Sequence, residues 1–124
     1  MFRSLLFVLL VATIYVLVDA EVELYSDKYD YINADEILNN DRLREQYYEC
    51  FMDTGPCLTA DAKFFKGNFP ESIVTKCAKC TEKQKAMFGK TVEWYTTNQE
   101  EKWKTLLAKF LEDAKKMKIA ADTA

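Results

Sequence analysis

The chain has 124 residues, a net charge of −3 at pH 7, four cysteines and no histidine. The lack of histidine removes the commonest general base and the commonest zinc ligand, which argues against histidine-dependent catalysis and typical zinc sites. Charges of both signs are interspersed without a basic stripe, so nucleic acid is not an expected partner. The length and the 14% aromatic content fit one small domain with an aromatic-rich interior.

The first twenty residues have the pattern of a secretory signal peptide. Arg3 supplies a positive charge, residues 5–18 are apolar, and Val18 and Ala20 are the small residues that a signal peptidase recognises. A transmembrane anchor is the alternative, but the apolar stretch is shorter than the roughly 20 residues that span a bilayer. We therefore expect residues 1–20 to be cleaved, residues 21–124 to form a single domain, and the protein to be secreted and extracellular without stable membrane insertion.

The following segments predict an all-α fold of five to six short helices. Apolar residues recur at helical spacing, and few glycines or prolines interrupt them. The first expected helix, residues 33–39, begins with a capping box of Asn33 and Glu36. The second, residues 41–52, is capped by Asp41 and turns one stripe inward: Leu43, Tyr47, Cys50 and Phe51.

In the middle of the chain, glycine and proline predict two separate helices. One begins at Thr59 or Asp61 and ends at Gly67. The next begins near Pro70, because proline is well tolerated in a first turn. Its apolar face would carry Ile73, Val74 and Cys77.

Two longer helices are expected to complete the fold. Thr81 and Gln84 form a second capping box, which opens a helix to about residue 97. Asn98 and Glu101 form a third box, which opens a C-terminal helix. The apolar stripe of this last helix consists of Trp103, Leu106, Leu107, Phe110, Leu111, Ala114 and Met117.

Four cysteines permit three disulfide connectivities. Adjacent pairing, Cys50–Cys57 and Cys77–Cys80, is favoured because each pair spans a helix end or a turn, where Cα atoms come within bridging distance. The Cys77–Cys80 spacing also matches the C-x-x-C of thiol oxidoreductases, but the βαβ context of such enzymes is missing. Export further favours disulfides over zinc. We expect structural disulfides, no metal, no cofactor and no enzymatic activity.

Several segments carry a family signature. They are residues 25–33 (YSDKYDYIN), 35–43 (DEILNNDRL), 47–50 (YYEC), 55–57 (GPC), 70–71 (PE), 77–84 (CAKCTEKQ) and 103–104 (WK). Together they resemble the insect chemosensory protein family, the OS-D-like secreted carriers. This resemblance implies six helices around a hydrophobic channel, two adjacent disulfides, binding of long-chain apolar ligands, and no catalysis.

The chain departs from the family pattern at two places. The segment between Cys57 and Cys77 is one residue longer than is usual in the family. After Phe110 the family continues with an Asp-Pro-x-Gly turn and a further helix, whereas here residues 111–117 follow directly. We therefore expect the last helix to be shortened or fused to the one before it.

The candidate ligand contacts come from two sources. The resemblance implies a polar pocket mouth of Tyr29, Asp30 and Gln84 that holds a ligand head group, with Trp103 matching the family's tryptophan. From the residues alone, Asp30 would be a surface acid and Gln84 a capping residue. The apolar rows of the helices supply the rest of the expected wall: Ile37, Leu43, Tyr47, Met87, Phe88, Thr91, Val92, Trp94 and Tyr95.

These residues predict a monomeric secreted carrier that binds small hydrophobic ligands, such as long-chain alcohols, esters, fatty acids and semiochemicals, in an internal apolar tunnel. Trp94 and Tyr95 are expected to matter more for binding than Tyr48. The main alternative is a secreted non-carrier interaction factor in development, immunity or a salivary or seminal role, in which the same residues are only core. A saposin-like membrane-active protein is a third reading, which a long-range Cys50–Cys80 bridge would favour.

Overall fold

The computed structural model describes residues 22–123, and the expected signal peptide lies outside this range. Five helices make up the described chain: α2 (Ala34–Leu38), α3 (Asp41–Phe51), α4 (Ala60–Thr75), α5 (Glu82–Asn98) and α6 (Glu100–Thr123). The predicted all-α fold is confirmed. Within the described residues, no helix combines the length and apolar character that a membrane span needs.

Side chains cap the start of four helices, as local sequence predicted, although not always at the expected residue. Thr81 and Gln84 form the predicted reciprocal capping box at the start of α5. Asn33 caps α2 by accepting hydrogen bonds from the backbone of the first turn. The cap of α3 is Asn40 and not Asp41, because the Asn40 side chain accepts from the Leu43 amide at 3.1 Å.

The two helices expected before and after the break at Gly67 are one helix, α4, which runs through both Gly67 and Pro70. A proline inside a helix costs about 3 kcal/mol through the lost hydrogen bond and steric clash. Here Pro70 and Ser72 are fully buried, and Phe65 on the same helix is buried as well. Tertiary packing therefore outweighs the local preference to break the helix.

The junction between α5 and α6 also differs from the prediction. Asn98 was expected to cap the last helix, but it is the final residue of α5, and its side chain donates to the Trp94 carbonyl at 2.8 Å. The chain turns at Gln99, and α6 begins at Glu100. The apolar stripe of α6 starts where it was predicted, with Leu106 and Phe110 almost completely buried.

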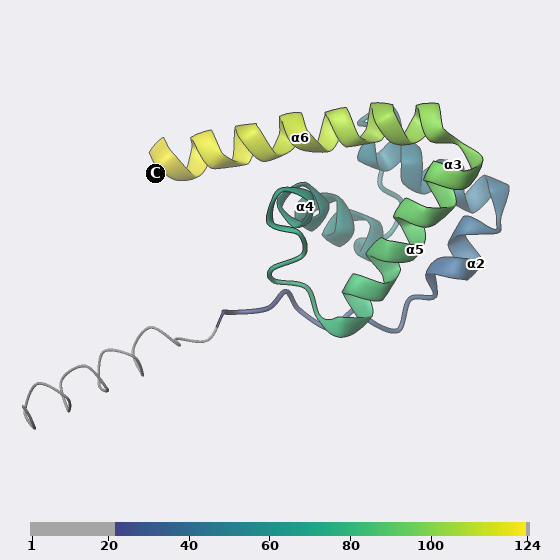
Figure 1. Cartoon of the computed structure of the whole chain (residues 1–124), viewed down its shortest axis with the longest axis horizontal. Helices are drawn as coiled ribbons and strands as arrows, with labels where there is room; N and C mark the ends of the chain where they lie inside the picture. The colour runs from purple at the N-terminus through teal and green to yellow at the C-terminus, as the bar shows by residue number, and fades with distance from the viewer. Residues whose placement is uncertain (1–21, 124) are drawn as a thin grey trace, which may run out of the picture.

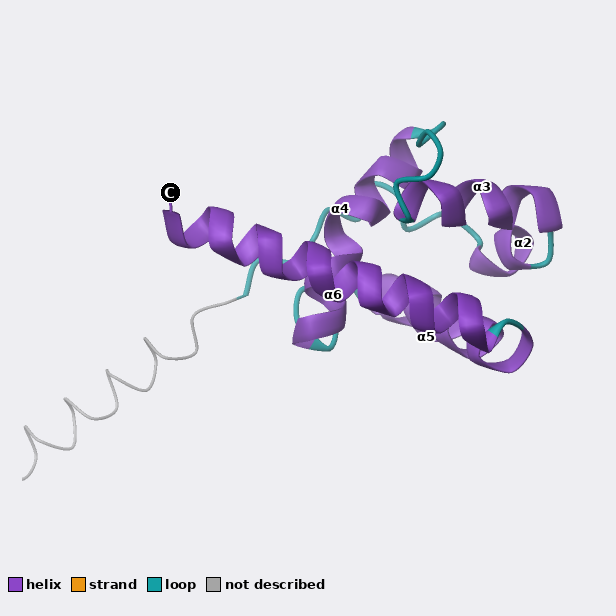
Figure 2. Cartoon of the chain, turned by 90° about the horizontal axis from the view of Figure 1, so that it is seen from above, coloured by secondary structure: helices purple, strands orange, loops and turns teal. Residues whose placement is uncertain are grey.

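Helix α6 continues without a break to Thr123, so the expected last helix is fused to the one before it. It crosses one side of the molecule, and its C-terminal end extends beyond the other helices in both views (Figures 1 and 2). Leu111 and Met117, which the stripe predicted to face inward, are 41% and 42% exposed. The inward face of α6 therefore covers the core only over its first half.

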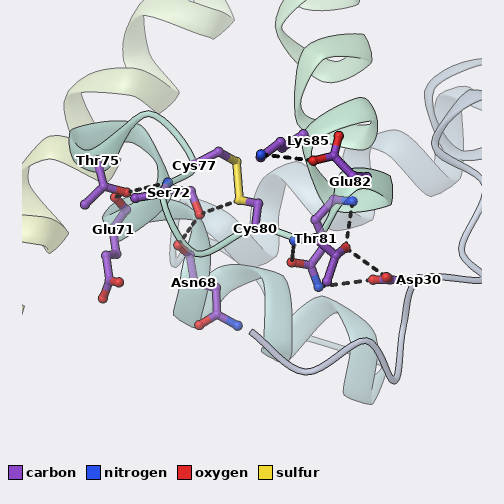
Figure 3. The surroundings of a disulfide bond; sticks show 12 residues. Asp30, Asn68, Glu71, Ser72, Thr75, Cys77, Cys80, Thr81, Glu82 and Lys85 are labelled. Carbon is purple, nitrogen blue, oxygen red and sulfur yellow. Dashed lines mark hydrogen bonds and ion pairs between the residues drawn. A yellow bond between two sulfur atoms is a disulfide. The ribbon is translucent and has the colours of Figure 1, made fainter. Parts of the chain in front are cut away.

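Both disulfides are local, as predicted. Cys50, at the end of α3, is bonded to Cys57, and Cys77 is bonded to Cys80 in the loop between α4 and α5 (Figure 3). The Cys50–Cys80 link that would have favoured a saposin-like protein does not form. Cys50 is only 1% exposed, so the first disulfide fastens the end of α3 directly to the core.

Candidate ligand-binding cavity

An apolar cavity lies at the centre of the five helices. Its volume is about 60 Å³, several times the roughly 10–15 Å³ that one water molecule requires. The helices α2 to α6 and Ile32, two residues before α2, all contribute to its wall. The wall is formed by Ile32, Ala34, Ile37, Leu38, Arg44, Tyr47, Tyr48, Phe51, Phe65, Phe69, Met87, Phe88, Thr91, Tyr95, Trp103, Leu106 and Phe110.

Packed phenylalanines form one part of this wall. Phe69 of α4 stacks on Phe65, with the ring centroids 5.3 Å apart. Its other contacts are edge-to-face, to Phe51 at 5.4 Å, Phe88 at 5.8 Å and Phe110 at 6.0 Å. Such offset and edge-to-face pairs are the favoured aromatic geometries, so this region presents a preformed apolar surface.

Tyrosines bring hydroxyl groups to the wall, and two of these have protein partners. Tyr47 donates its hydroxyl hydrogen to Asp61, and Tyr48 donates to the Lys102 carbonyl at 3.3 Å. Burial raises the pKa of Tyr95 above its ordinary value, with the nearby Glu45 carboxylate adding to the effect. The tyrosine hydroxyls therefore stay neutral at physiological pH and keep the cavity free of phenolate charge.

Arg44 is the one charged residue of the wall. It is 6% exposed. Its Nη1 donates to the Leu38 carbonyl at 2.7 Å, and its Nη2 to Asp41 Oδ1 at 3.0 Å. The guanidinium carbon also lies 4.1 Å from the ring centroid of Trp94, a cation–π contact. A charged group is costly to bury in an apolar wall, and these hydrogen bonds and the cation–π contact offset that cost.

Sequence and structure comparisons place this chain in a known family. The family described as "Insect pheromone-binding family, A10/OS-D" matches residues 25–118. The chain belongs to this family. It is 42% identical over 95 residues to ejaculatory bulb-specific protein 3 of Drosophila melanogaster, covering 77% of this chain and 74% of that one. The allergen Tha p 1 of Thaumetopoea pityocampa is 41% identical over 88 residues, covering 71% and 69%.

Solved structures of chemosensory proteins share the fold of this OS-D family member. A chemosensory protein in complex with bromo-dodecanol superposes with a TM-score of 0.67 and 38% identity, covering 81% of this chain and 99% of that chain. The antennal chemosensory protein A6 of the moth Mamestra brassicae gives a TM-score of 0.60 at 37% identity, covering 80% and 91%. The resemblance in the sequence motifs is thereby confirmed at the level of the whole fold.

Seven of the predicted contact residues line the cavity of this OS-D protein. Two come from α2 and α3, four from the inward rows of α5, and one from α6. They are Ile37, Tyr47, Met87, Phe88, Thr91, Tyr95 and Trp103. Helical spacing therefore placed four of the six residues of the two predicted α5 rows on the cavity wall.

The polar residues expected at the pocket mouth lie elsewhere. Gln84 donates through Nε2 to Asp30 Oδ1 at 3.1 Å and to the Ser26 carbonyl at 2.9 Å. Thr81 Oγ1 donates to the other Asp30 oxygen at 2.8 Å (Figure 3). The ring of Tyr29 packs against Phe64, with the centroids 5.0 Å apart. These groups join the N-terminal segment to α5 and do not line the cavity.

Three apolar predictions also fall outside the wall. Trp94 contacts the outer side of the Arg44 guanidinium and lines a shallow surface depression with Asp35 and Asn98. Leu43 and Val92 are half-buried but absent from the cavity wall. Tyr48, expected to matter less than Trp94, is part of the wall. Successive residues of a helix point about 100° apart. Helical spacing alone therefore did not decide which of two adjacent aromatic residues, such as Trp94 and Tyr95, faces the cavity.

Sequence reasoning missed ten residues of the wall. For three of these a signal existed, because the expected apolar stripes of the second and last helices already contained Phe51, Leu106 and Phe110. Arg44 is the charged residue among the other seven, and a charge in an amphipathic helix predicts a solvent-exposed position. The ten are Ile32, Ala34, Leu38, Arg44, Tyr48, Phe51, Phe65, Phe69, Leu106 and Phe110.

A second, smaller void of about 10 Å³ adjoins the cavity on the side of the Cys77–Cys80 disulfide. Both disulfide cysteines line it, together with Tyr25 and Gln84. The residues common to both spaces are Phe65, Phe69, Met87 and Phe88. A few side chains therefore separate two neighbouring apolar spaces.

Proposed function

We propose that this protein is a secreted carrier that binds one linear apolar molecule in the central cavity. The observation that carries this proposal is an apolar cavity walled by all five described helices, in a chain that shares its fold with a chemosensory protein bound to bromo-dodecanol. Suitable ligands are long-chain alcohols, esters and fatty acids, including semiochemicals of these classes. The signal-peptide pattern and the two disulfides support secretion. The proposed role involves no chemical step on the ligand.

The size of the cavity requires that ligand entry moves side chains. About 60 Å³ is too small for a chain of a dozen methylenes at the close packing of protein interiors. Met87 is unbranched and readily changes rotamer, and it stands with Phe88 between the cavity and the second void. In our proposal, displacement of these two side chains joins the spaces into a tunnel that accepts an extended alkyl chain.

The expected affinity is moderate. Burying about twelve methylenes at roughly 0.8 kcal/mol each gives a gross gain of about 10 kcal/mol. Lost ligand mobility and the ordering of the chain remove several kcal/mol of this. A dissociation constant in the low micromolar range, which corresponds to about 8 kcal/mol, is therefore expected, with weak discrimination between chains of similar length.

A displacement titration tests the proposal. The purified, disulfide-bonded protein is loaded with the fluorescent apolar probe N-phenyl-1-naphthylamine and titrated with 1-dodecanol, methyl dodecanoate and dodecanoic acid. Displacement with micromolar constants supports a carrier. If the probe does not bind, or if none of the three compounds displaces it, the cavity is only core, and a secreted interaction factor becomes the better description. If the compounds do displace the probe, mass spectrometry of lipid that co-purifies from native tissue would identify the natural ligand.

A further inference from the structure

We infer that Arg44 is the head-group anchor of the cavity and that the preferred ligand is a fatty acid, bound as its carboxylate. This inference rests on the proposed carrier function and specifies the ligand's polar end. Arg44 is the charged residue of an otherwise apolar and phenolic wall. A permanent positive charge there favours a ligand that brings a negative one.

The hydrogen bonds of Arg44 leave one of its three nitrogens without a partner among the described residues. The guanidinium has five N–H groups. Nη1 donates to the Leu38 carbonyl and Nη2 to Asp41, whereas Nε is buried and has no hydrogen-bond partner among the residues that the structure describes. A buried donor without an acceptor is unfavourable, and a ligand oxygen reaching this part of the wall would satisfy it.

The charges around Arg44 leave room for an anion. Its ion-pair partner, Asp41, has a side chain that is 92% exposed, so water screens that pair strongly. The neighbouring carboxylate of Glu45 is engaged by Lys102 at 2.6 Å. The tyrosines Tyr48 and Tyr95 of the wall are neutral. A ligand carboxylate would therefore meet a guanidinium whose charge is only partly balanced within the protein.

The orientation of the guanidinium is fixed in advance. The Leu38 carbonyl holds one end at 2.7 Å, and the ring of Trp94 covers one face at 4.1 Å. A guanidinium whose orientation is already fixed loses little conformational freedom when it donates hydrogen bonds to a carboxylate. Arginine therefore suits such ligands better than lysine. This assigns Trp94 a positioning role: it acts on the ligand through Arg44.

The alternative is that Arg44 is purely structural, since it holds the end of α2 through Leu38. A structural role would change the stability of the protein and the binding of all ligands alike. An anchoring role would change binding according to head group. The two roles can therefore be separated by comparing ligands that share one alkyl chain.

The test compares dodecanoic acid, methyl dodecanoate and 1-dodecanol as displacers of N-phenyl-1-naphthylamine at pH 7. Arg44→Gln is the variant, and Arg42→Gln, at an exposed position on the same helix, is the matched control. We expect Arg44→Gln to weaken dodecanoate binding at least about tenfold, the scale of one charge-assisted hydrogen bond, and dodecanol binding about twofold or less. Arg42→Gln should leave all three constants unchanged. Equal losses for acid, ester and alcohol in Arg44→Gln would overturn the assignment.

A second measurement uses the unmodified protein and does not depend on the variant folding. Dodecanoic acid labelled with ¹³C at the carboxyl carbon is titrated with acid, free and bound, and followed by NMR. An anchored carboxylate should protonate at a lower pH when bound, because the guanidinium stabilises its charged form. Protonation at the same or a higher pH than the free acid contradicts the anchor. Failure of all three compounds to displace the probe from the unmodified protein would instead refute the carrier proposal itself, and the anchor with it.

Discussion

The Gln84 side-chain amide lies 3.1 Å from Asp30 Oδ1, and this hydrogen bond ties the N-terminal segment to the first turn of α5. Ser26, Asp30, Thr81 and Gln84 together form a cluster that we call the N-terminal latch. Both oxygens of the Asp30 carboxylate accept hydrogen bonds, and Gln84 also accepts from the Thr81 amide at 3.0 Å. The latch contains Asp30 and Gln84, two of the polar groups that the family resemblance placed at the ligand head group, and in this structure they are hydrogen-bonded within the protein.

Replacement of Asp30 by asparagine should destabilise the protein without changing ligand binding. The variant lacks one of the two acceptors, which leaves Thr81 or Gln84 with an unsatisfied, partly buried donor at a cost of about 1–3 kcal/mol. Urea unfolding with intact disulfides measures this loss. Asp27→Asn, at an exposed position in the same segment, is the control and should be neutral. Unchanged stability with weaker binding of dodecanol would restore the head-group role.

Replacement of Thr91 by leucine should weaken the binding of apolar ligands. Thr91 lines the cavity, and its hydroxyl is bonded to the Met87 carbonyl at 2.8 Å. A larger side chain fills part of a space of about 60 Å³ and resists the opening that ligand entry needs. We expect roughly a tenfold loss, because overpacking costs about 1–3 kcal/mol.

The matched control for this variant is Thr96→Leu. Thr96 lies on the same helix, makes the same kind of hydroxyl bond to the Val92 carbonyl, and is exposed. Probe titration of both variants, with folding verified by circular dichroism, isolates the effect of position. A folded Thr91→Leu protein that binds long-chain alcohols as well as the unmodified protein does would show that the ligand lies elsewhere.

The local features of the fold were predictable because interactions between residues close in the sequence determine them. The capping box of Thr81 and Gln84 needs only residues within one helical turn. The adjacent disulfides likewise close over a few residues, where chain geometry leaves little choice. Helical spacing also predicted most of the inner face of α5, namely Met87, Phe88, Thr91 and Tyr95.

Features that depend on tertiary contacts were not predictable from local sequence. The local sequence predicts that a helix begins near Pro70, but the burial of Pro70 within α4 keeps the helix continuous. Trp94 and Tyr95 are adjacent aromatic residues, and in the fold Tyr95 lines the cavity whereas Trp94 packs on Arg44. The role of Arg44 itself depends on a hydrogen bond back to Leu38 and on a cavity that five helices build together.

Replacement of Asp53 by asparagine should weaken the link between the turn after α3 and helices α4 and α6. Hydrogen bonds from Lys109 and Lys66 lower the pKa of Asp53 to about 2. Since the folded pKa lies below the unfolded value of about 3.9, the stabilisation is present above pH 4 and is lost as the pH falls towards 2. Asparagine tolerates the left-handed backbone of this residue, which has a φ of 61°, so the variant isolates the charge.

The Asp53 side chain is about half exposed, so solvent screening limits the effect to about 0.2–1 kcal/mol at pH 7. Urea unfolding at several pH values between 7 and 2 measures it, and the difference between the variant and the unmodified protein should shrink below pH 4. Lys109→Gln provides the second arm of a double-mutant cycle. If Asp53→Asn costs as much in the Lys109→Gln background, the two side chains are not coupled.

Alkaline solution should destabilise the protein through its buried tyrosines. Burial, more than any neighbouring charge, raises the pKa of Tyr47 and Tyr95 above the ordinary value of about 10. The unfolded chain therefore releases these protons first, so stability is unaffected by them below about pH 10 and falls as the pH rises above it. Tyr95→Phe should lose stability less steeply between pH 10 and 12 than the unmodified protein, whereas Tyr31→Phe, at a residue that is 76% exposed, should not differ from it. Urea unfolding at several pH values gives the slope of the unfolding free energy against pH for each protein, and absorbance follows phenolate formation. Equal slopes for Tyr95→Phe and the unmodified protein would contradict the prediction, because Tyr95 would then ionise as an exposed tyrosine does.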